Sequence, residues 1–282
     1  MSLSRAIIYP VARRFFAGVN LGPALERIKE DNTFGIGATV DFLGEDVADT
    51  SEAEMAKAEY RRAIEAIEFE ALDASVAIKL THIGLDISSI LAENNALEIA
   101  AVAKERGVFL WVDMESSEHT DSIIKIYRKM LSKGVPAGLA LQASLKRTWD
   151  DIKALTADGA RIRLVKGAYN EPPEIAVQDM GGIRARFIDM ARYLLDSGAS
   201  FAIGTHDLLI IDRVREMASG ADRVEYQMLM GLRDSTKKKL VREGLRVVEY
   251  VPYGADWYGY GIRRLTEKKR NALYFVQGLM GR

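Results

Sequence analysis

The sequence contains no cysteine, which excludes disulfides, iron–sulfur clusters, thiolate zinc sites and cysteine nucleophiles. It has only three histidines, His82, His119 and His206, and no His-x-His pair, so the usual ligands of a metal hydrolase are missing. No G-x-S-x-G motif marks a serine nucleophile. We therefore expect neither a metal site nor a serine hydrolase.

The sequence also lacks a charge excess of either sign and any long apolar run. Its 39 basic and 40 acidic residues leave a formal net charge of -1, so we expect no nucleic-acid partner. No run of about 18 apolar residues is present, and no membrane-spanning helix is predicted. Because 48% of its 282 residues are hydrophobic, the chain can bury a large core. The absence of cysteine is compatible with a reducing cytoplasm, and we expect a cytoplasmic protein.

Eight short runs rich in β-branched and apolar residues recur along the chain and predict strands. They cover residues 38–43, 75–80, 108–113, 138–143, 161–166, 200–205, 223–228 and 246–251. The segments between them repeat apolar residues at three- and four-residue spacing, which predicts helices. This alternation predicts an α/β fold, a (β/α)8 TIM barrel. We expect a helical arm at residues 1–37 and the catalytic barrel at 38–282, in a single domain overall.

Polar side chains follow the predicted strands, at the barrel edge where active sites lie. They are Asp41, Glu45, Lys79, Asp113, Gln142, Arg163, Lys166, Thr205, His206, Gln227, Tyr250, Arg263 and Arg264. The cations Lys79, Arg163, Arg263 and Arg264, set against few acids, favour an anionic ligand in the barrel mouth. The longest connection, residues 168–186, contains two prolines and two glycines, and it is either a lid or an irregular surface loop.

The two adjacent arginines follow an aromatic, glycine-spaced turn near the C-terminus. Helical spacing would place Tyr260, Arg263, Arg264 and Glu267 on one face. Planar guanidinium groups bind carboxylates bidentately and stay charged at any working pH. A solvated cationic turn remains the alternative for the arginines taken alone.

Six motifs together resemble those of the proline dehydrogenases, FAD enzymes built on a distorted (β/α)8 barrel. They are DFLGE (41–45), LWVDME (110–115), RLVKGAY (163–169), GTHD (204–207), YQML (226–229) and YVPYGADWYGYGIRRLTE (250–267). The similarity runs in consistent order from about residue 20 to the end. It implies oxidation of L-proline to Δ1-pyrroline-5-carboxylate by hydride transfer from proline C5 to FAD, with the electrons passed on to a membrane quinone.

The resemblance also implies roles for the residues around the substrate. The matching substrate positions are Lys79, Ala168, Tyr169, Leu229, Tyr250, Tyr260, Arg263 and Arg264. Arg263 and Arg264 would grip the proline carboxylate, and Lys79 would add positive charge. Asp113 would orient the arginine and tyrosine side chains, while Glu45 would pair with Arg263 to gate the site. Tyr250 implies a preference for proline over 4-hydroxyproline, because relatives that prefer hydroxyproline carry a smaller residue there.

For the cofactor, the resemblance implies a second set of positions. They are Gln142, Arg163, Lys166, Gly167, Ala168, Thr205, His206 and Gln227. Arg163 would lie near the redox-active ring nitrogen of FAD and stabilise the electron-rich reduced ring. The sequence departs from the family pattern at Ser144 and at Gly204, and both positions adjoin the expected flavin site.

Several alternatives stay open at this stage. The chain could oxidise another cyclic or N-alkyl amino acid, act as a lyase or isomerase on a carboxylate, or serve as a ligand sensor without flavin. The product would leave for a separate pyrroline-5-carboxylate dehydrogenase. The basic stretches 235–242 and 267–270 are either solvated helix faces or peripheral contacts with the inner face of the cell membrane.

Overall fold

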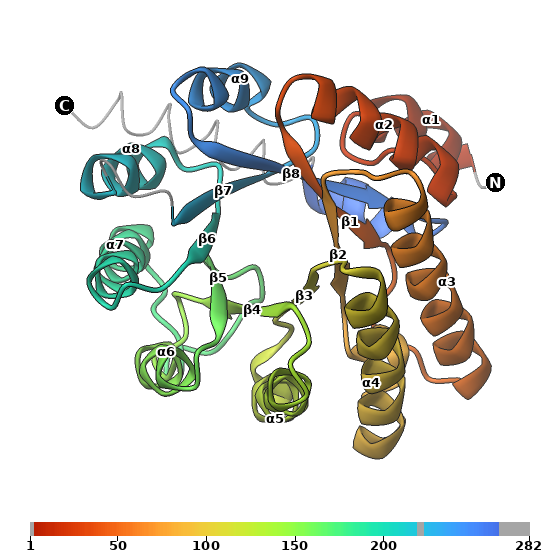
Figure 1. Cartoon of the computed structure of the whole chain (residues 1–282), viewed down its shortest axis with the longest axis horizontal. Helices are drawn as coiled ribbons and strands as arrows, with labels where there is room; N and C mark the ends of the chain where they lie inside the picture. Colours follow the sequence, from red (N-terminus) through yellow and green to blue (C-terminus); the bar gives the residue numbers. More distant parts are fainter. Residues whose placement is uncertain (1–2, 219–222, 265–282) are drawn as a thin grey trace.

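The computed structural model describes residues 3–218 and 223–264, in which eight parallel strands close into a barrel (Figure 1). The strands are β1 (Gly37–Phe42), β2 (Ala74–Ile78), β3 (Leu110–Val112), β4 (Ala137–Gln142), β5 (Arg161–Val165), β6 (Phe201–Gly204), β7 (Val224–Leu229) and β8 (Arg246–Tyr253). Each strand pairs with the next in the chain, and β8 closes the barrel on β1 with Val251 opposite Val40. The predicted TIM barrel is confirmed.

Helices alternate with the strands and surround the barrel (Figure 1). They are α1 (Leu3–Ala12), α2 (Leu21–Thr33), α3 (Thr50–Phe69), α4 (Ser89–Arg106), α5 (Thr120–Ser132), α6 (Thr148–Ala157), α7 (Met180–Asp196), α8 (Leu208–Met217) and α9 (Asp234–Arg242), with short 3-10 helices η1 (Thr81–Ile83) and η2 (Ser117–His119). The first two precede β1, as expected of the helical arm. Whether residue 38 is a domain boundary stays a prediction.

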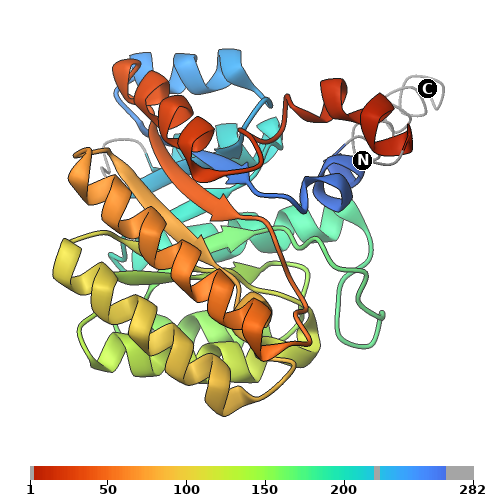
Figure 2. The ribbon, with the colours of Figure 1, turned by 90° about the vertical axis from the view of Figure 1, so that its right-hand side faces the viewer.

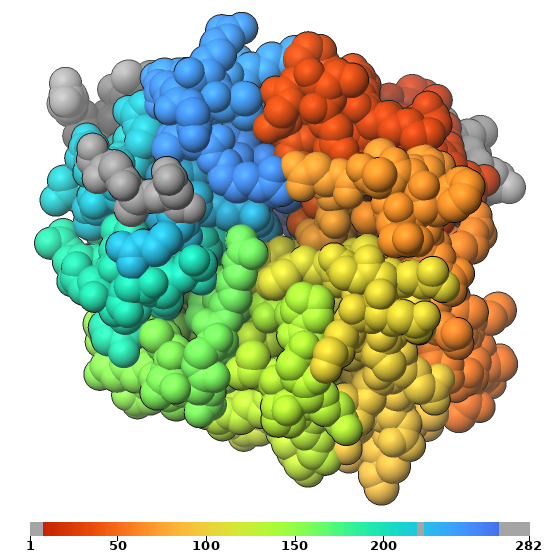
Figure 3. All heavy atoms as spheres, in the orientation of Figure 1, coloured from red at the N-terminus to blue at the C-terminus, as the bar shows by residue number. Residues whose placement is uncertain are grey.

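The barrel interior contains buried aromatic and charged side chains. Trp111 of β3 is 1% exposed and packs with buried alanines of β2 and β6. The guanidinium carbons of Arg161 and Arg163 lie 5.5 and 4.9 Å from its ring centroid, within cation–π range. Gly138 of β4 leaves room for the indole, because an added Cβ would clash with it. In the space-filling view, side chains occupy the middle of the barrel (Figure 3).

The long connection after β5 is shorter than the sequence pattern suggests. Helix α7 begins at Met180, so Gly181 and Gly182 lie in its first turn and not in the loop. Asp179 caps this helix by accepting a hydrogen bond from the Gly182 N–H at 2.6 Å. The remaining loop is anchored, because Glu171 accepts hydrogen bonds from the Ser117 N–H (2.7 Å) and hydroxyl (2.6 Å).

The N-terminal helix and the residues after β8 pack together on one side of the barrel. Residues 257–264 are helical, and Trp257 stacks on Phe16 at 5.3 Å between ring centroids and meets Tyr9 edge-on at 5.0 Å. Figure 2 shows these segments and the loop after β5 on the side toward which β1 points. This is the side where a barrel of this kind carries its active site.

Candidate active site

Side chains from five strands meet at this end of the barrel around the carboxylate of Asp113. Its Oδ1 accepts a hydrogen bond from Arg163 Nη2, and its Oδ2 accepts one from the Tyr250 hydroxyl at 2.7 Å. Lys79 Nζ lies 3.6 Å from the same Oδ2 and 2.6 Å from Asp41 Oδ1. Tyr250 and Asp113 lie 137 residues apart in the sequence. They meet here because the barrel brings the carboxyl ends of its parallel strands together.

Burial and neighbouring charges set the protonation of this network. Burial, and then the charge of Asp41, raise the pKa of Tyr250, so its phenol stays neutral and donates to Asp113. Burial, the largest single influence, would lower the pKa of Lys79, but the surrounding groups, led by the Asp41 carboxylate, together raise it and keep the ammonium group charged. Burial lowers the pKa of Arg163, whose guanidinium group nevertheless remains protonated at any working pH.

The Arg163 side chain is held in one orientation from several directions. Its guanidinium group lies between the rings of Trp111 and Tyr250, 4.9 and 5.6 Å from their centroids. Its Nη1 donates to Gln227 Oε1 at 3.3 Å, and Gln227 Nε2 donates to Glu225 Oε1 at 2.6 Å. A cation fixed in this way can stabilise negative charge without reorganising, which is the electrostatic task expected of Arg163.

The adjacent arginines stand on helical residues 257–264. Arg263 Nη1 forms an ion pair with Glu45 Oε1 at 3.0 Å, which is the pairing that the gate hypothesis requires. The guanidinium carbon of Arg264 lies 5.3 Å from the ring centroid of Tyr260, which is 8% exposed. Tyr260 and Arg264 therefore share a face at i and i+4, as predicted. The fourth member of that face, Glu267, lies outside the described residues.

Gln142 offers a buried acceptor to a bound group, and the neighbouring Gly167 is a position that only glycine can fill. Gln142 Nε2 donates to the Glu115 carbonyl at 2.9 Å, while its Oε1 is buried and has no hydrogen-bond partner within residues 3–218 and 223–264. A buried acceptor of this kind is normally satisfied. Gly167 has φ +115°, and an added Cβ would clash with Ser144 Oγ. Only glycine fits there, because Ser144 occupies the place that a Cβ would take and the backbone is left-handed.

The remaining cofactor positions form a charged cluster after β5 and β6. Lys166 Nζ and Arg184 Nε contact Asp207 Oδ2 at 3.3 and 2.8 Å, and Thr205 Oγ1 accepts from the Asp207 N–H at 3.2 Å. His206 Nε2 accepts from the Leu229 N–H at 2.9 Å, so its proton resides on Nδ1. Burial, followed by the charge of Arg264, lowers the pKa of His206 to about 3 and keeps the imidazole neutral.

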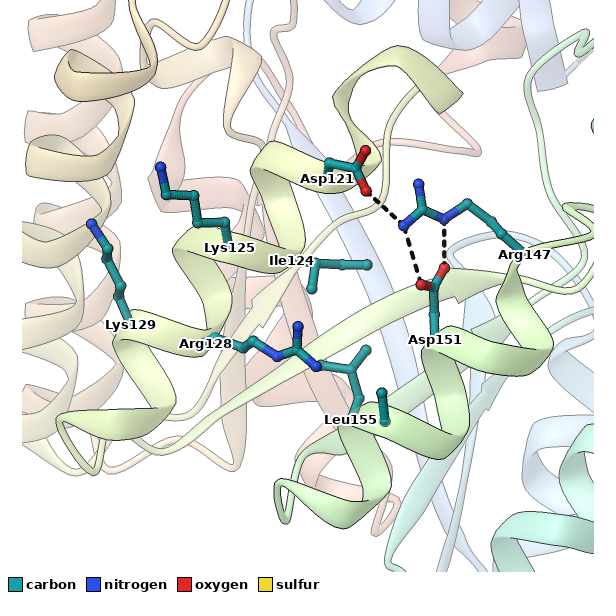
Figure 4. Close-up of a pocket in the computed structure, with 9 residues that line it drawn as sticks. Asp121, Ile124, Lys125, Arg128, Lys129, Arg147, Asp151 and Leu155 are labelled. Carbon is teal, nitrogen blue, oxygen red and sulfur yellow. Dashed lines mark hydrogen bonds and ion pairs between the residues drawn. The ribbon is translucent and has the colours of Figure 1, made fainter.

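Ala168 and Tyr169 stand in the loop after β5, and both are exposed. Tyr169 borders a hollow of about 300 Å³ that is also lined by Asp46, Glu115 and His119. Another hollow, of about 350 Å³, lies away from the barrel mouth, between the outer helices α5 and α6 (Figure 4). There Arg147 bridges Asp121 and Asp151 at 2.6 and 2.8 Å. We place the site at the mouth, where the buried charges converge.

Sequence reasoning assigned no role to several residues of this region. They are Trp111, Thr81, Glu115 and Asp207. Three of them lie inside the quoted motifs LWVDME and GTHD, which were the available signal. Thr81 lies in no motif, and its contacts become evident only from the fold. Within the described parts of the chain, no group of three or more acidic or histidine side chains could hold a metal ion.

Comparisons with known proteins identify the family of this chain. A sequence profile of the family described as proline dehydrogenase matches residues 24–276. The chain belongs to the proline dehydrogenase family. It is 38% identical to Proline dehydrogenase 1 of Bacillus subtilis subsp. natto, over 95% of this chain and 90% of that protein. It is 33% identical to the Proline dehydrogenase of Deinococcus radiodurans, over 99% and 93% of the two chains.

Solved structures show the same fold in a larger protein. Proline utilization A from Bdellovibrio bacteriovorus, inactivated by N-propargylglycine, matches with a TM-score of 0.84 at 23% identity. The match covers 91% of this chain and 32% of that one, so the chain spans about a third of that solved protein. Flavin-dependent oxidation of proline to Δ1-pyrroline-5-carboxylate, the first step of proline catabolism, is the activity of proline dehydrogenases, and this chain is an oxidoreductase of that family.

Proposed function

We propose that this chain oxidises L-proline with a noncovalently bound FAD. The observation that carries the proposal is the Asp113 network, which fixes a buried Arg163 beside Tyr250 at the barrel mouth. The buried Gln142 Oε1, which has no hydrogen-bond partner among the described residues, suits an isoalloxazine ring, which offers an N–H donor. When bound there, FAD would supply the acceptor for the hydride that leaves proline C5.

The side chains of this protein would bind and orient the substrate. Arg263 and Arg264 hold the proline carboxylate through charge-assisted hydrogen bonds, and Lys79 adds positive charge beside them. Tyr250 and Tyr260 lie against the ring, and Ala168 and Leu229 complete its apolar wall with Tyr169 nearby. This arrangement positions C5 and excludes water from it, while the chain itself forms no covalent bond to the substrate.

Residues of β4, β5 and β7 and of the segments after β5 and β6 would hold the FAD. Arg163 would stabilise negative charge on the ring, and Gln142 and Gln227 would lie along it. Lys166, Gly167, Ala168, Thr205 and His206 would contact the ribityl, phosphate and adenine portion. Thr205 and His206 already have fixed backbone partners, which supports a preformed site.

Family membership supports three further assignments. The electrons would pass to a membrane quinone, a separate pyrroline-5-carboxylate dehydrogenase would take the product, and the protein would work in the cytoplasm, with peripheral contact at the inner face of the cell membrane. Every helix within the described ranges is too short or too polar to cross a bilayer. Of the basic stretch 235–242, Lys237 is only 1% exposed and pairs with Glu249, so it cannot contact lipid. The stretch 267–270 lies outside the described residues.

A substrate panel tests the proposal against its main alternative. L-proline, 4-hydroxyproline and N-methylglycine would be compared by kcat/KM with an artificial electron acceptor, and the product would be identified as Δ1-pyrroline-5-carboxylate. We expect L-proline to give the highest kcat/KM. A higher value for N-methylglycine or another N-alkyl amino acid would reject the substrate assignment while keeping the flavin chemistry.

A further inference from the structure

A buried threonine and a buried glutamate lie directly behind the candidate gate. Thr81 and Glu115 are 0% and 2% exposed. The Thr81 N–H donates to Glu115 Oε1 at 3.1 Å, and the Thr81 hydroxyl donates to Glu115 Oε2. The carboxylate therefore accepts both donors of Thr81. Burial raises the pKa of Glu115, and these two hydrogen bonds oppose the rise.

Thr81 in turn holds the backbone next to the gate residue Glu45. Its Oγ1 accepts the Asp46 N–H at 3.0 Å, and its carbonyl accepts the Val47 N–H at 3.3 Å. Asp46 has φ +57°, a left-handed conformation that a non-glycine residue keeps only where its surroundings hold it. The Glu45–Arg263 ion pair is partly exposed, with side chains 30% and 52% accessible. An exposed ion pair contributes little by itself. We therefore expect the backbone conformation at Asp46 to determine the position of the neighbouring Glu45 side chain.

Glu115 also contacts the expected flavin wall. Its carbonyl accepts the Gln142 Nε2 hydrogen bond at 2.9 Å, and Gln142 is 2% exposed. Glu115 thus contacts Thr81 beside the candidate gate through its carboxylate, and Gln142 of the expected flavin site through its backbone carbonyl. Neither Thr81 nor Glu115 is among the residues assigned to substrate or flavin.

We propose that Thr81 and Glu115 are positioning residues for the gate. The Glu115 carboxylate accepts the Thr81 hydroxyl proton and so turns the lone pairs of that oxygen toward the Asp46 N–H. Asp46 is thereby locked in its left-handed conformation, and Glu45 is held where it meets Arg263. The proposal rests on the proposed role of the Glu45–Arg263 pair in proline binding, and it adds the residues that act through that pair.

Replacing Thr81 by an isosteric residue tests the hydroxyl alone. Thr81→Val keeps the shape and removes the hydrogen bonds of Oγ1, whereas Thr81→Ser keeps the hydroxyl and serves as the matched control. We expect Thr81→Val to raise the KM for proline about three- to tenfold, which corresponds to the loss of roughly one hydrogen bond. The limiting rate of flavin reduction should change less. Thr81→Ser should stay near the KM of the wild-type protein.

A double-mutant cycle with Glu45→Ala separates positioning from general stability. If Thr81 acts through Glu45, then Thr81→Val should raise KM little further in the Glu45→Ala background. An undiminished rise in that background, or an unchanged KM in Thr81→Val alone, overturns the inference and leaves the gate intact. An unchanged KM in Glu45→Ala alone refutes the proposed gate itself, and the inference falls with it.

Glu115→Gln provides a second test if Thr81→Val fails to fold. With its oxygen toward the Thr81 N–H, the amide that replaces the carboxylate would donate to Oγ1 instead of accepting its proton. The hydroxyl proton would then turn elsewhere, and the contact of Oγ1 with the Asp46 N–H would weaken. We expect the same rise in KM, and the same loss of that rise in the Glu45→Ala background. A Glu115→Gln protein with unchanged proline KM overturns the inference.

Discussion

Two aspartates determine the charge balance at the barrel mouth. Asp41 and Asp113 pair with Lys79 and Arg163, so these two cations are largely neutralised within the protein. Counting lysines and arginines in the sequence therefore overstates the positive charge offered to a ligand. The proposed contacts for a carboxylate are Arg263 and Arg264 on the helical segment after β8, and the pairing of Arg263 with Glu45 is more exposed than those two pairs.

Removing either of these two arginines should weaken proline binding. In Arg264→Met or Arg263→Met, the loss of a charge-assisted contact worth roughly 1.5–3 kcal/mol should raise the proline KM about 10- to 100-fold. Bound flavin, measured by its absorbance, should be retained. Arg213→Met is the matched control, because Arg213 lies exposed on α8 and pairs within its own helix, with Glu216 at 3.1 Å. An unchanged KM in both clamp variants would refute the clamp.

Ring selectivity should depend on the size of the side chain at position 250. Tyr250→Ser opens space that a ring hydroxyl needs, so it should lower activity with proline and narrow the advantage of proline over 4-hydroxyproline. Pocket differences of this size are worth roughly 1–3 kcal/mol, or about 10- to 200-fold in kcat/KM.

Tyr250→Phe is the control for that comparison, because it keeps the ring but removes the 2.7 Å hydrogen bond to Asp113. It should lower the kcat/KM for proline without changing the ratio between the two substrates. A ratio in Tyr250→Ser equal to that of the wild-type protein would show that Tyr250 does not line the ring pocket.

Sequence motifs identified single site residues better than their partners. The side chains of Asp113, Arg163 and Tyr250 meet in the structure, because a barrel brings the carboxyl ends of its strands together. The contact between Thr81 and Glu115 spans 34 residues and that between Lys166 and Asp207 spans 41, and neither follows a fixed spacing. Such pairs depend on the register of neighbouring strands and on where each strand ends, which a single sequence does not contain.

Among the elements, the strands were predicted within about two residues, because runs of β-branched and apolar residues define buried parallel strands. Their ends were less accurate where local turns intervene. The predicted strand 75–80 stops at Ile78, since Leu80 already accepts the turn hydrogen bonds of η1. The loop before α7 was predicted too long because Gly181 and Gly182 resemble loop residues. In the structure they accommodate the Asp179 cap, and a Cβ at Gly182 would approach Asp179 Oδ2 to 2.8 Å.

A buried charge cluster joins α2, α9 and β8. Glu249 of β8 is 0% exposed and accepts hydrogen bonds from Arg27 Nε at 2.9 Å and from Lys237 Nζ. Asp31 is 2% exposed and lies 2.8 Å from Arg27 Nη2. Burial, and then the charge of Glu249, raise the pKa of Asp31 to about 8. The cluster anchors the strand whose next residue is Tyr250.

Stability should therefore depend on pH through Asp31. Its pKa in the unfolded chain is about 3.9, so the native state binds the extra proton between about pH 4 and pH 8. The contribution of Asp31 to the free energy of unfolding is present below this window and is lost as the pH rises through it. Asp31→Asn cannot titrate, so its stability relative to the wild-type protein should improve as the pH rises.

Urea unfolding at about pH 5 and about pH 8 measures this difference. The lowered pKa values of His82 and His206 make stability rise with pH below about 6.5. This effect is the same in the wild-type protein and in Asp31→Asn, so it cancels when their free energies of unfolding are subtracted. A difference in the free energy of unfolding that stays constant between the two pH values would contradict the account.

At the scale of the whole molecule, the two ends of the described chain meet over the barrel mouth. Helix α1 packs on residues 257–264, where Gly261 faces Ala12 so closely that an added Cβ would lie 2.9 Å from Ala12 Cβ. This contact sets the position of the helical segment that carries Arg263 and Arg264. The sequence predicted both segments as helices, but not that one supports the other, because their packing brings together residues from opposite ends of the chain.

The central claim is that this barrel binds FAD and reduces it with L-proline, and the absorption spectrum of the purified or FAD-reconstituted protein tests it most directly. We expect the visible bands of bound flavin, and we expect L-proline to bleach them when added without oxygen. A flavin-containing protein that L-proline does not bleach would contradict the substrate assignment. A protein that takes up no FAD on reconstitution would contradict the whole account.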